Sequence, residues 1–215
     1  MPIKNSFFLK AILMLCLITP CAAQPENIKP KKIPSVSLWS QLFDNFHTVE
    51  KGKLYRSQQL SPQKLAWYLK KYQIKTVVNL RGAKHDELWW HLEKKASSWH
   101  KAEHHDIAMS AQTFPSKKSL KKLLDIYKTA KQPILIHCLG GADRTGEAAA
   151  VWALAVQKKN VNDALSHLSP WYHHFVFKAP KKQQFIKMWR GIDWALKTYF
   201  PPDEHQKTIK LAKNE

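Results

Sequence analysis

The sequence of 215 residues is poor in acidic side chains, in cysteine and in long apolar segments. Only 16 aspartate and glutamate residues stand against 35 lysine and arginine residues, so the formal net charge is +19. A charge of this size attracts anions through screened solvent. Phosphorylated substrates, anionic lipid and nucleic acid all fit it, as does a basic solvated surface without a specific partner. Charge alone therefore does not identify the partner.

The one long apolar run lies at the N-terminus. Lys4 and Lys10 precede an apolar run over residues 11–18, and Pro20-Cys21-Ala22-Ala23 then offers small residues for cleavage. The run is too short to span a bilayer as a finished helix. We therefore expect residues 1–23 to be a signal peptide and the product to be exported, periplasmic or secreted, and soluble after cleavage. A retained membrane anchor is the alternative, and residues 24–37 read as a linker rich in proline and lysine.

Cysteine is scarce, and its placement is informative. Two of the three cysteines, Cys16 and Cys21, fall in the predicted signal peptide, which leaves Cys138 alone in the exported product. A lone thiol cannot form a structural intramolecular disulfide in an oxidising compartment. Cys138 is then either a buried, inert residue or a reactive one, and its neighbours in the sequence favour reactivity.

Hydrophobic patterns predict alternating strands and helices. We expect a hairpin over 46–57 and strands over 76–80, 102–109 and 133–137. Helices are expected over 61–72, 86–96, 145–157, 162–168 and 180–198, and an amphipathic helix is expected from Ser116. This alternation predicts an α/β fold with a mainly parallel central sheet flanked by helices. We place one domain at 38–200 and a polar C-terminal tail at 201–215; the sequence contains no internal repeat.

The segment from His137 to Gly146 joins the strand predicted at 133–137 to the helix predicted at 145–157. The N-terminus of a helix binds anions through unpaired N–H groups and the helix dipole, and glycines let the backbone curl around phosphate oxygens. A ligand is expected at this end of an α/β sheet. The predicted phosphate-binding residues are Leu139, Gly140, Gly141, Ala142, Asp143 and Arg144.

Cys138 is the predicted nucleophile, because the surrounding N–H groups and Arg144 would stabilise its thiolate. Arg144 offers a planar fork that holds two phosphate oxygens, in the substrate and more strongly in the transition state. Thr145 is expected to hydrogen-bond the sulfur when it leaves phosphorus. His137 is expected to support the loop through backbone hydrogen bonds.

This pattern, Cys-x5-Arg-Thr-Gly preceded by His after an apolar strand, resembles the signature of the protein tyrosine and dual-specificity phosphatases. Residues 53–57 and 75–82 also resemble the early strands of bacterial dual-specificity-like members. The resemblance implies a three-layer cysteine-phosphatase-like domain. It also implies a two-step reaction through a phosphocysteine that needs no metal and no cofactor.

The reaction needs a general acid for the leaving oxygen. In many dual-specificity phosphatases it is an aspartate on a loop about thirty residues before the cysteine. Asp106 lies at about that distance but inside the strand predicted at 102–109, and the following loop, 110–115, contains no acid. Asp143 is the preferred candidate on reach, and Gly-x-Asp-Arg-Thr resembles some bacterial tyrosine and lipid phosphatases and myotubularin-like ones. Asp106 remains the alternative.

Three functions stay open. Phosphotyrosine or other phosphoprotein is the first substrate class. Phosphoinositides or other phospholipids come second, because lipid phosphatases of this type often carry lysines inside the loop, whereas residues 139–142 are uncharged. The third is a catalytically silent module that only binds a phosphorylated partner. The oligomeric state is not predicted.

Other features have ordinary explanations. His104 and His105 would point to opposite faces of a strand, so a metal site with His100 or Asp106 is not expected, and His173 and His174 are taken as solvated or packed. Most of the nine tryptophans, Trp67, Trp89, Trp152, Trp171, Trp189 and Trp194 among them, are assigned to the core, which makes nucleic acid an unlikely partner. The lysines at 117, 118, 121 and 122 form a solvated face or a docking surface for an acidic substrate or an anionic membrane.

Overall fold

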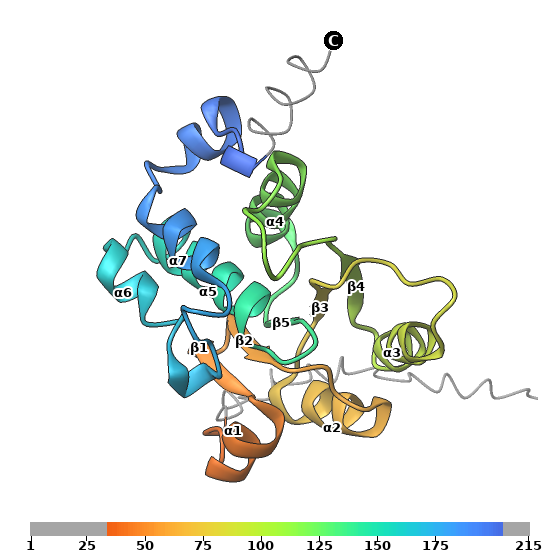
Figure 1. Cartoon of the computed structure of the whole chain (residues 1–215). Helices are drawn as coiled ribbons and strands as arrows, with labels where there is room; N and C mark the ends of the chain where they lie inside the picture. Colours follow the sequence, from red (N-terminus) through yellow and green to blue (C-terminus); the bar gives the residue numbers. More distant parts are fainter. Residues whose placement is uncertain (1–33, 204–215) are drawn as a thin grey trace, which may run out of the picture. The chain divides into compact units, whose positions relative to one another are not determined.

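The computed structural model describes residues 34–203. The predicted signal peptide, residues 1–23, lies outside the described residues, as do most of the predicted linker and the tail from residue 204. The described part is built on a five-stranded sheet with the order β1-β2-β5-β3-β4 (Figure 1). The strands are β1 (His47–Glu50), β2 (Leu54–Ser57), β3 (Thr76–Asn79), β4 (Glu103–Asp106) and β5 (Ile134–His137). Only β1 is antiparallel to its neighbour.

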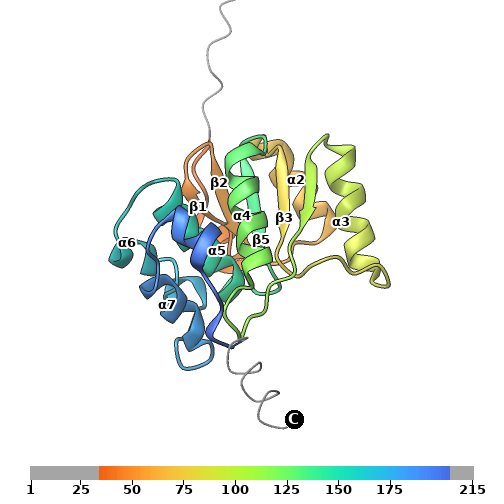
Figure 2. The same cartoon turned by 90° about the horizontal axis from the view of Figure 1, so that it is seen from above.

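Helices cover both faces of the sheet (Figures 1 and 2). One face is covered by α2 (Pro62–Tyr72) and α3 (Leu88–Trp99), and the other by α4 (Lys117–Thr129) and α5 (Asp143–Ala155), with α7 (Pro180–Lys187) packed against α5. The shorter helices are α1 (Leu38–Asp44), α6 (Val161–Leu165), η1 (Pro170–Tyr172) and η2 (Trp194–Thr198). The predicted three-layer α/β fold with a mainly parallel sheet is therefore confirmed.

The strands divide their side chains between two cores, as the two-residue period of a strand requires. Leu54, Ile134 and Ile136 are fully buried on the side of α4 and α5. Tyr55 and Leu135 are buried on the opposite side, against α2. Arg56, which shares a face with Leu54, is also fully buried, and this polar side chain under the end of β2 matters for the site described below.

Alanines allow α5 to pack closely under the sheet. Ala148, Ala149, Ala150 and Trp152 have no exposed surface. A β-carbon added to Gly146 would lie 2.7 Å from Leu168 Cδ2 and 2.9 Å from the His167 carbonyl oxygen, so glycine permits the segment after α6 to lie against the first turn of α5. The helix is thus fixed by its surroundings from its first turn onward.

Several predicted boundaries were wrong. The helix predicted over 180–198 ends at Lys187; Gly191, with a φ of +108°, then keeps the chain from continuing as one helix, and a π-helical turn, η2, follows. The helix predicted from Thr145 begins at Asp143. The strand predicted over 102–109 ends at Asp106, beyond which a single bridge joins Ala108 to Arg81. The predicted hairpin and the helix capped by Ser61 are confirmed.

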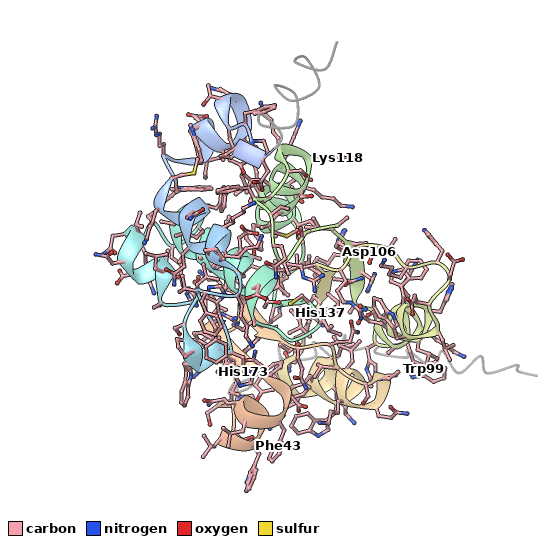
Figure 3. All side chains as sticks on the ribbon, in the orientation of Figure 1. Phe43, Trp99, Asp106, Lys118, His137 and His173 are labelled. Carbon is pink, nitrogen blue, oxygen red and sulfur yellow. The ribbon has the colours of Figure 1, made fainter. Side chains whose placement is uncertain are left out.

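Two tryptophans assigned to the core lie on the surface. Trp67 is 50% exposed because α2 turns Leu65, Tyr68, Leu69 and Tyr72 inward and leaves position 67 outside. Lys71 Nζ lies 4.3 Å from the centre of its ring. Trp171 is 59% exposed on η1, whereas Trp152 is fully buried as expected. Figure 3 also shows Trp99 projecting outward at the end of α3.

The polar tail was predicted to begin at residue 201, but residues 201–203 pack against the rest of the chain. Pro201 is buried, and Asp203 accepts hydrogen bonds from the Phe114 backbone N–H and from Lys181 Nζ. The segment up to residue 203 is therefore tied to the loop before α4.

Among residues 34–203, no helix is long and apolar enough to cross a membrane.

Candidate active site

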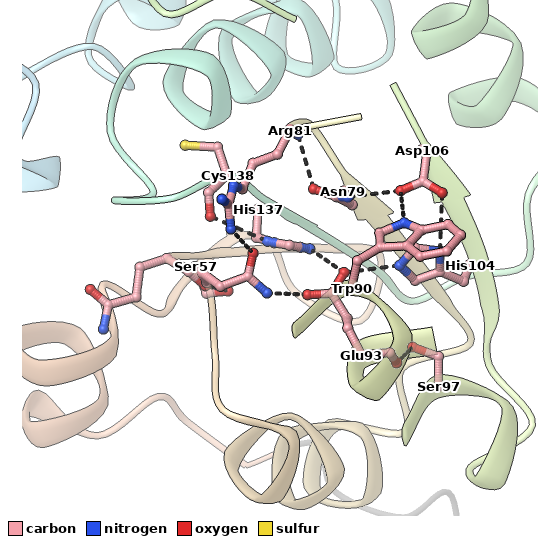
Figure 4. A network of polar contacts seen from close by, with 12 residues as sticks. Ser57, Asn79, Arg81, Trp90, Glu93, Ser97, His104, Asp106, His137 and Cys138 are labelled. Carbon is pink, nitrogen blue, oxygen red and sulfur yellow. Dashed lines mark hydrogen bonds and ion pairs between the residues drawn. The ribbon is translucent and has the colours of Figure 1, made fainter. Parts of the chain in front are cut away.

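The Cys138 loop, residues 138–142, follows the central strand β5 and leads directly into α5. Cys138 is 3% exposed and is a free thiol. Because β5 lies between β2 and β3, both neighbouring strands end beside the loop. Figure 4 shows Cys138 next to His137 and Arg81 at this edge. This is the position where parallel α/β sheets bind ligands.

The surrounding scaffold holds the carbonyl groups of three successive loop residues. The Leu139 carbonyl accepts from the Gln59 backbone N–H at 2.9 Å, the Gly140 carbonyl from Asn45 Nδ2 at 3.0 Å, and the Gly141 carbonyl from Arg56 Nη2 at 2.7 Å. A trans peptide points its C=O and its N–H in opposite directions. The N–H groups of residues 140–142 therefore point away from the scaffold, toward the concave side of the loop, where an anion would lie.

Arg56 supports the Cys138 loop through its hydrogen bond to the Gly141 carbonyl, and the sequence alone did not indicate this role. Its Nη1 donates to the His167 carbonyl at 2.9 Å, and its guanidinium carbon lies 4.0 Å from the centre of the Tyr172 ring. Burial lowers the pKa of Arg56 to about 10. Burial and then the Arg56 charge lower the pKa values of His47 and His167 to about 4. Arg56 was not predictable, because an arginine in the short strand β2 has the same sequence pattern whether its side chain is buried or exposed.

Arg144 and Thr145 follow in the first turn of α5. Arg144 Nε is buried, and within the described residues it has no hydrogen-bond partner. The Thr145 hydroxyl is likewise buried and lacks a partner in the described part of the chain. Buried donors are rarely left unpaired, so these two groups fit a ligand that supplies acceptors. Both residues were predicted for the site, and both stand in the first turn of the helix that the Cys138 loop leads into.

Asp143 is paired with a residue that sequence reasoning dismissed. His174 Nδ1 lies 2.7 Å from Asp143 Oδ1, and the His174 side chain is fully buried. The Asp143 side chain is 28% exposed at the start of α5. The contact spans 31 residues of sequence, and no local pattern connects the two positions.

Asp106, the alternative acid, lies at the end of β4, two strands away from β5. Its Oδ1 accepts from Asn79 Nδ2 at 2.7 Å and from Trp90 Nε1 at 3.0 Å, and its Oδ2 lies 3.7 Å from His104 Nδ1 (Figure 4). Figure 3 labels Asp106 apart from His137. Its side chain is thus engaged in a structural network between β3, β4 and α3.

The loop over 110–115, which contains no acid, is fixed by the C-terminal segment. Lys182 Nζ donates to the Thr113 carbonyl at 2.7 Å, and Tyr199 donates its hydroxyl proton to the Pro115 carbonyl at 2.8 Å. Lys182 also pairs with Glu147 Oε2 at 2.9 Å, and both side chains are fully buried. Burial raises the pKa of Glu147 to about 7, against the influence of Lys182.

Glu93 organises the polar network behind the Cys138 loop (Figure 4). Its Oε1 lies 3.1 Å from His137 Nε2 and 2.9 Å from His104 Nε2, while Gln59 donates to Oε2. Burial by itself would raise the pKa of Glu93, but His137 and His104 outweigh burial and hold it well below its usual range. His137 Nδ1 in turn lies 3.3 Å from the Cys138 carbonyl oxygen, so His137 contacts the loop backbone as expected.

Arg81 adds a second guanidinium near the loop. Its Nη1 donates to Gln59 Oε1 at 3.1 Å, and its guanidinium carbon lies 3.8 Å from the centre of the Trp89 ring. Burial and the nearby charge of Arg144 lower the pKa of Arg81, whereas carboxylates and Cys138 oppose this effect. The sequence alone did not indicate Arg81 as a site residue. Within residues 34–203 no group of three His, Cys, Asp or Glu side chains is arranged to hold a metal ion.

Solved structures with the same fold are known. The structure of TpbA from P. aeruginosa has a TM-score of 0.58 at 21% identity, covering 75% of this chain and 92% of that one. The core catalytic domain of the PP-IP phosphatase SIW14 from S. cerevisiae has a TM-score of 0.56 at 22% identity, covering 80% and 93%. These similarities show a shared fold.

Sequence relatives point the same way. The human dual specificity protein phosphatase CDC14C is 24% identical over 142 residues, which is 66% of this chain. The chain spans only 30% of that relative's length. The family described as "DSP-PTPase phosphatase fused to NAD+ Kinase" matches residues 26–187. Because this match extends over well more than half of the chain, the protein belongs to this DSP-PTPase family.

Proposed function

We propose that this phosphatase hydrolyses phosphomonoesters through a phosphocysteine formed on Cys138. The observation that carries the proposal is the Cys138 loop itself: its carbonyls are held outward, its N–H groups point inward, and Arg144 Nε is buried without a partner in the described residues. Such an arrangement fits three phosphate oxygens and a sulfur beneath them.

In the first step the Cys138 thiolate attacks phosphorus. A P–S bond forms, the P–O bond of the ester breaks, and the leaving oxygen takes a proton from the general acid. Arg144 and the N–H groups of residues 140–142 stabilise the charge that develops on the equatorial oxygens. In the second step water attacks phosphorus, the P–S bond breaks, and the carboxylate takes the proton of the water. The Thr145 hydroxyl is suited to donate a hydrogen bond to the departing thiolate.

We assign the acid to Asp143. It stands in the first turn of α5 beside Arg144 and is partly exposed, as a group that meets the leaving oxygen must be. Asp106 is bonded to Asn79 and Trp90 two strands away. In the assigned role, Asp143→Asn lowers the rate by about 100-fold or more for substrates with poor leaving groups.

Phosphotyrosine in proteins is the first substrate class. TpbA, which shares the fold, has been solved in complex with pTyr. Arg81 supports the second class, phosphoinositides and related polyphosphates, because it places a second guanidinium near Arg144. A panel of phosphotyrosyl peptides, phosphoinositides and inositol pyrophosphates separates the two. If Arg81→Gln weakens turnover of the polyphosphates alone, the second class is favoured.

One alternative is not an enzyme: a catalytically silent module that only binds phosphate. The loop at 110–115 favours it, because this loop contains no acidic residue that could protonate a leaving group. An assay with an aryl phosphate decides between an active phosphatase and a module that only binds phosphate. We expect turnover by the natural chain, none by Cys138→Ser, and a protein mass increased by one phosphoryl group on rapid quenching. Turnover equal to that of Cys138→Ser would favour the module.

We also propose that residues 1–23 direct export. Expression of the whole chain followed by fractionation and N-terminal sequencing tests this. The expected product lies outside the cytoplasm and begins at Gln24; an intact N-terminus on a cytoplasmic product would refute export.

A further inference from the structure

The pairing of His174 with Asp143 has no part in the family resemblance and needs its own explanation. His174 follows His173, whose φ of +62° turns the chain, and its backbone N–H donates to the Ser169 carbonyl at 3.1 Å. These features bring the ring under the start of α5, where Nδ1 meets Asp143 Oδ1 at 2.7 Å. The ring is thus held both by its backbone and by the carboxyl.

Folding alone does not account for this histidine. Its side chain has no exposed surface, and its Nε2 is buried with no hydrogen-bond partner in the part of the chain that the structure describes. A buried nitrogen without a partner opposes folding, and an apolar side chain of similar volume would avoid that cost. The contact that the imidazole provides, and that an apolar residue would lose, is the one to Asp143.

We propose that His174 is the positioning residue for the acid, which deepens the proposed function and rests on it. With its proton on Nδ1, the neutral ring donates to Oδ1 both when Asp143 carries a proton and when it is a carboxylate. Oδ2 is then the oxygen that delivers a proton to the leaving group and later receives one from water. The carboxyl keeps one orientation through both steps, which a flexible side chain at a helix start would not do by itself.

The nature of the leaving group separates a positioning role from a merely structural one. Aryl phosphates with a good leaving group, such as 2,4-dinitrophenyl phosphate, depart without a proton, whereas phenyl phosphate needs one. The quantity to compare is kcat/KM, which reports steps up to cleavage of the P–O bond. Loss of structure lowers kcat/KM for both substrates, but loss of acid orientation lowers it for phenyl phosphate alone.

Three variants define the experiment. His174→Leu removes the donor while filling the site, and we expect kcat/KM for phenyl phosphate to fall about 10-fold or more with little change for dinitrophenyl phosphate. His174→Asn places an amide N–H near the position of Nδ1, and we expect it to restore most of the loss. His173→Asn is the control, since asparagine tolerates positive φ and His173 is exposed; the variant should hydrolyse both substrates at the rates of the natural chain.

Equal losses on both substrates with His174→Leu, or no loss on either, would overturn the positioning role. In an Asp143→Asn background His174→Leu should add no further loss, and an added loss would also count against it. If Asp143→Asn lowers kcat/KM equally for the two substrates, the assignment of Asp143 as the acid is wrong, and the proposed function fails independently of His174. Should His174→Leu not fold, His174→Met takes its place, with the melting temperature as the check.

Discussion

Gly141 and Gly140 offer a matched test of how the Cys138 loop is held. Gly141 has a φ of +69°, and a β-carbon there would lie 2.7 Å from the carbonyl carbon and oxygen of Ser57 and from the Gln58 nitrogen. At Gly140 no atom lies within 4 Å of an added β-carbon, and its φ is not positive. The two alanine variants therefore add the same methyl group in very different surroundings.

The expected magnitudes follow from these contacts. Alanine in the left-handed region costs about 1–2 kcal/mol. The overlap with backbone atoms of Ser57 and Gln58, which cannot rotate away, adds about 1–3 kcal/mol. Gly141→Ala should therefore lower the free energy of unfolding by about 2–5 kcal/mol. Gly140→Ala should leave it unchanged or raise it by about 0.5 kcal/mol, because alanine restricts the unfolded chain.

Urea unfolding followed by tryptophan fluorescence measures both variants, with the m-value as a check that the transition stays comparable. Activity gives a second reading, since Gly141→Ala must also displace the carbonyl that Arg56 holds. If the two variants unfold at the same urea concentration, the loop does not rest on the end of β2 in the way the contacts indicate.

Three further predictions concern buried charge. Glu93→Gln removes the negative partner of His137 and His104, and the free energy of unfolding at pH 7 should fall by about 3 kcal/mol in a urea titration; an unchanged midpoint would contradict the paired state of Glu93. Lys182→Met leaves Glu147 buried without its partner and should lower the free energy of unfolding by about 3–5 kcal/mol. Adding Glu147→Leu should recover most of this loss. A double variant no more stable than the single one would argue against the pair. His47 and His167 have folded pKa values of about 4, below the ordinary 6.5, so the stability they contribute is present above pH 6.5 and is lost as pH falls toward 4. Each histidine should lower the free energy of unfolding by about 3 kcal/mol over that range, whereas Glu147, whose pKa is raised, acts in the opposite direction. A chain with His47→Gln and His167→Asn should therefore lose stability less steeply in acid, and an equally steep loss would refute the shifts.

The elements around the Cys138 loop were predictable because they depend on local patterns. The apolar residues at 134–136 and the alanines of α5 fix a strand and a tightly packed helix whatever surrounds them, and Ser61-Pro62 starts α2 through a cap within its own first turn. Gly191 shows the limit of this reasoning. One helix was predicted over 180–198, but α7 ends at Lys187 and the φ of +108° at Gly191 separates it from the turn that follows.

The polar partners were not predictable, because each contact joins segments far apart in the chain. Arg56 reaches Gly141, Asn45 reaches Gly140, and His174 reaches Asp143. A single arginine in a short strand, or one of two adjacent histidines in a loop, has the same local signal whether it faces water or a buried carbonyl. Trp67 and Trp171 were misplaced for the same reason, since the aromatic type alone does not say which face of an element is covered.

The sequence by itself determined the alternation of strands and helices and the placement of Cys138, Asp143 and Arg144 at the junction of β5 and α5, since those features follow from spacing within a short stretch of chain. Only the tertiary structure decided that Arg56 and Asn45 hold the loop, that Asp106 is bound into a separate network, and that His174 is buried against Asp143. The physical reason is that burial and hydrogen bonding between distant segments depend on how the layers pack, and packing is a property of the whole fold.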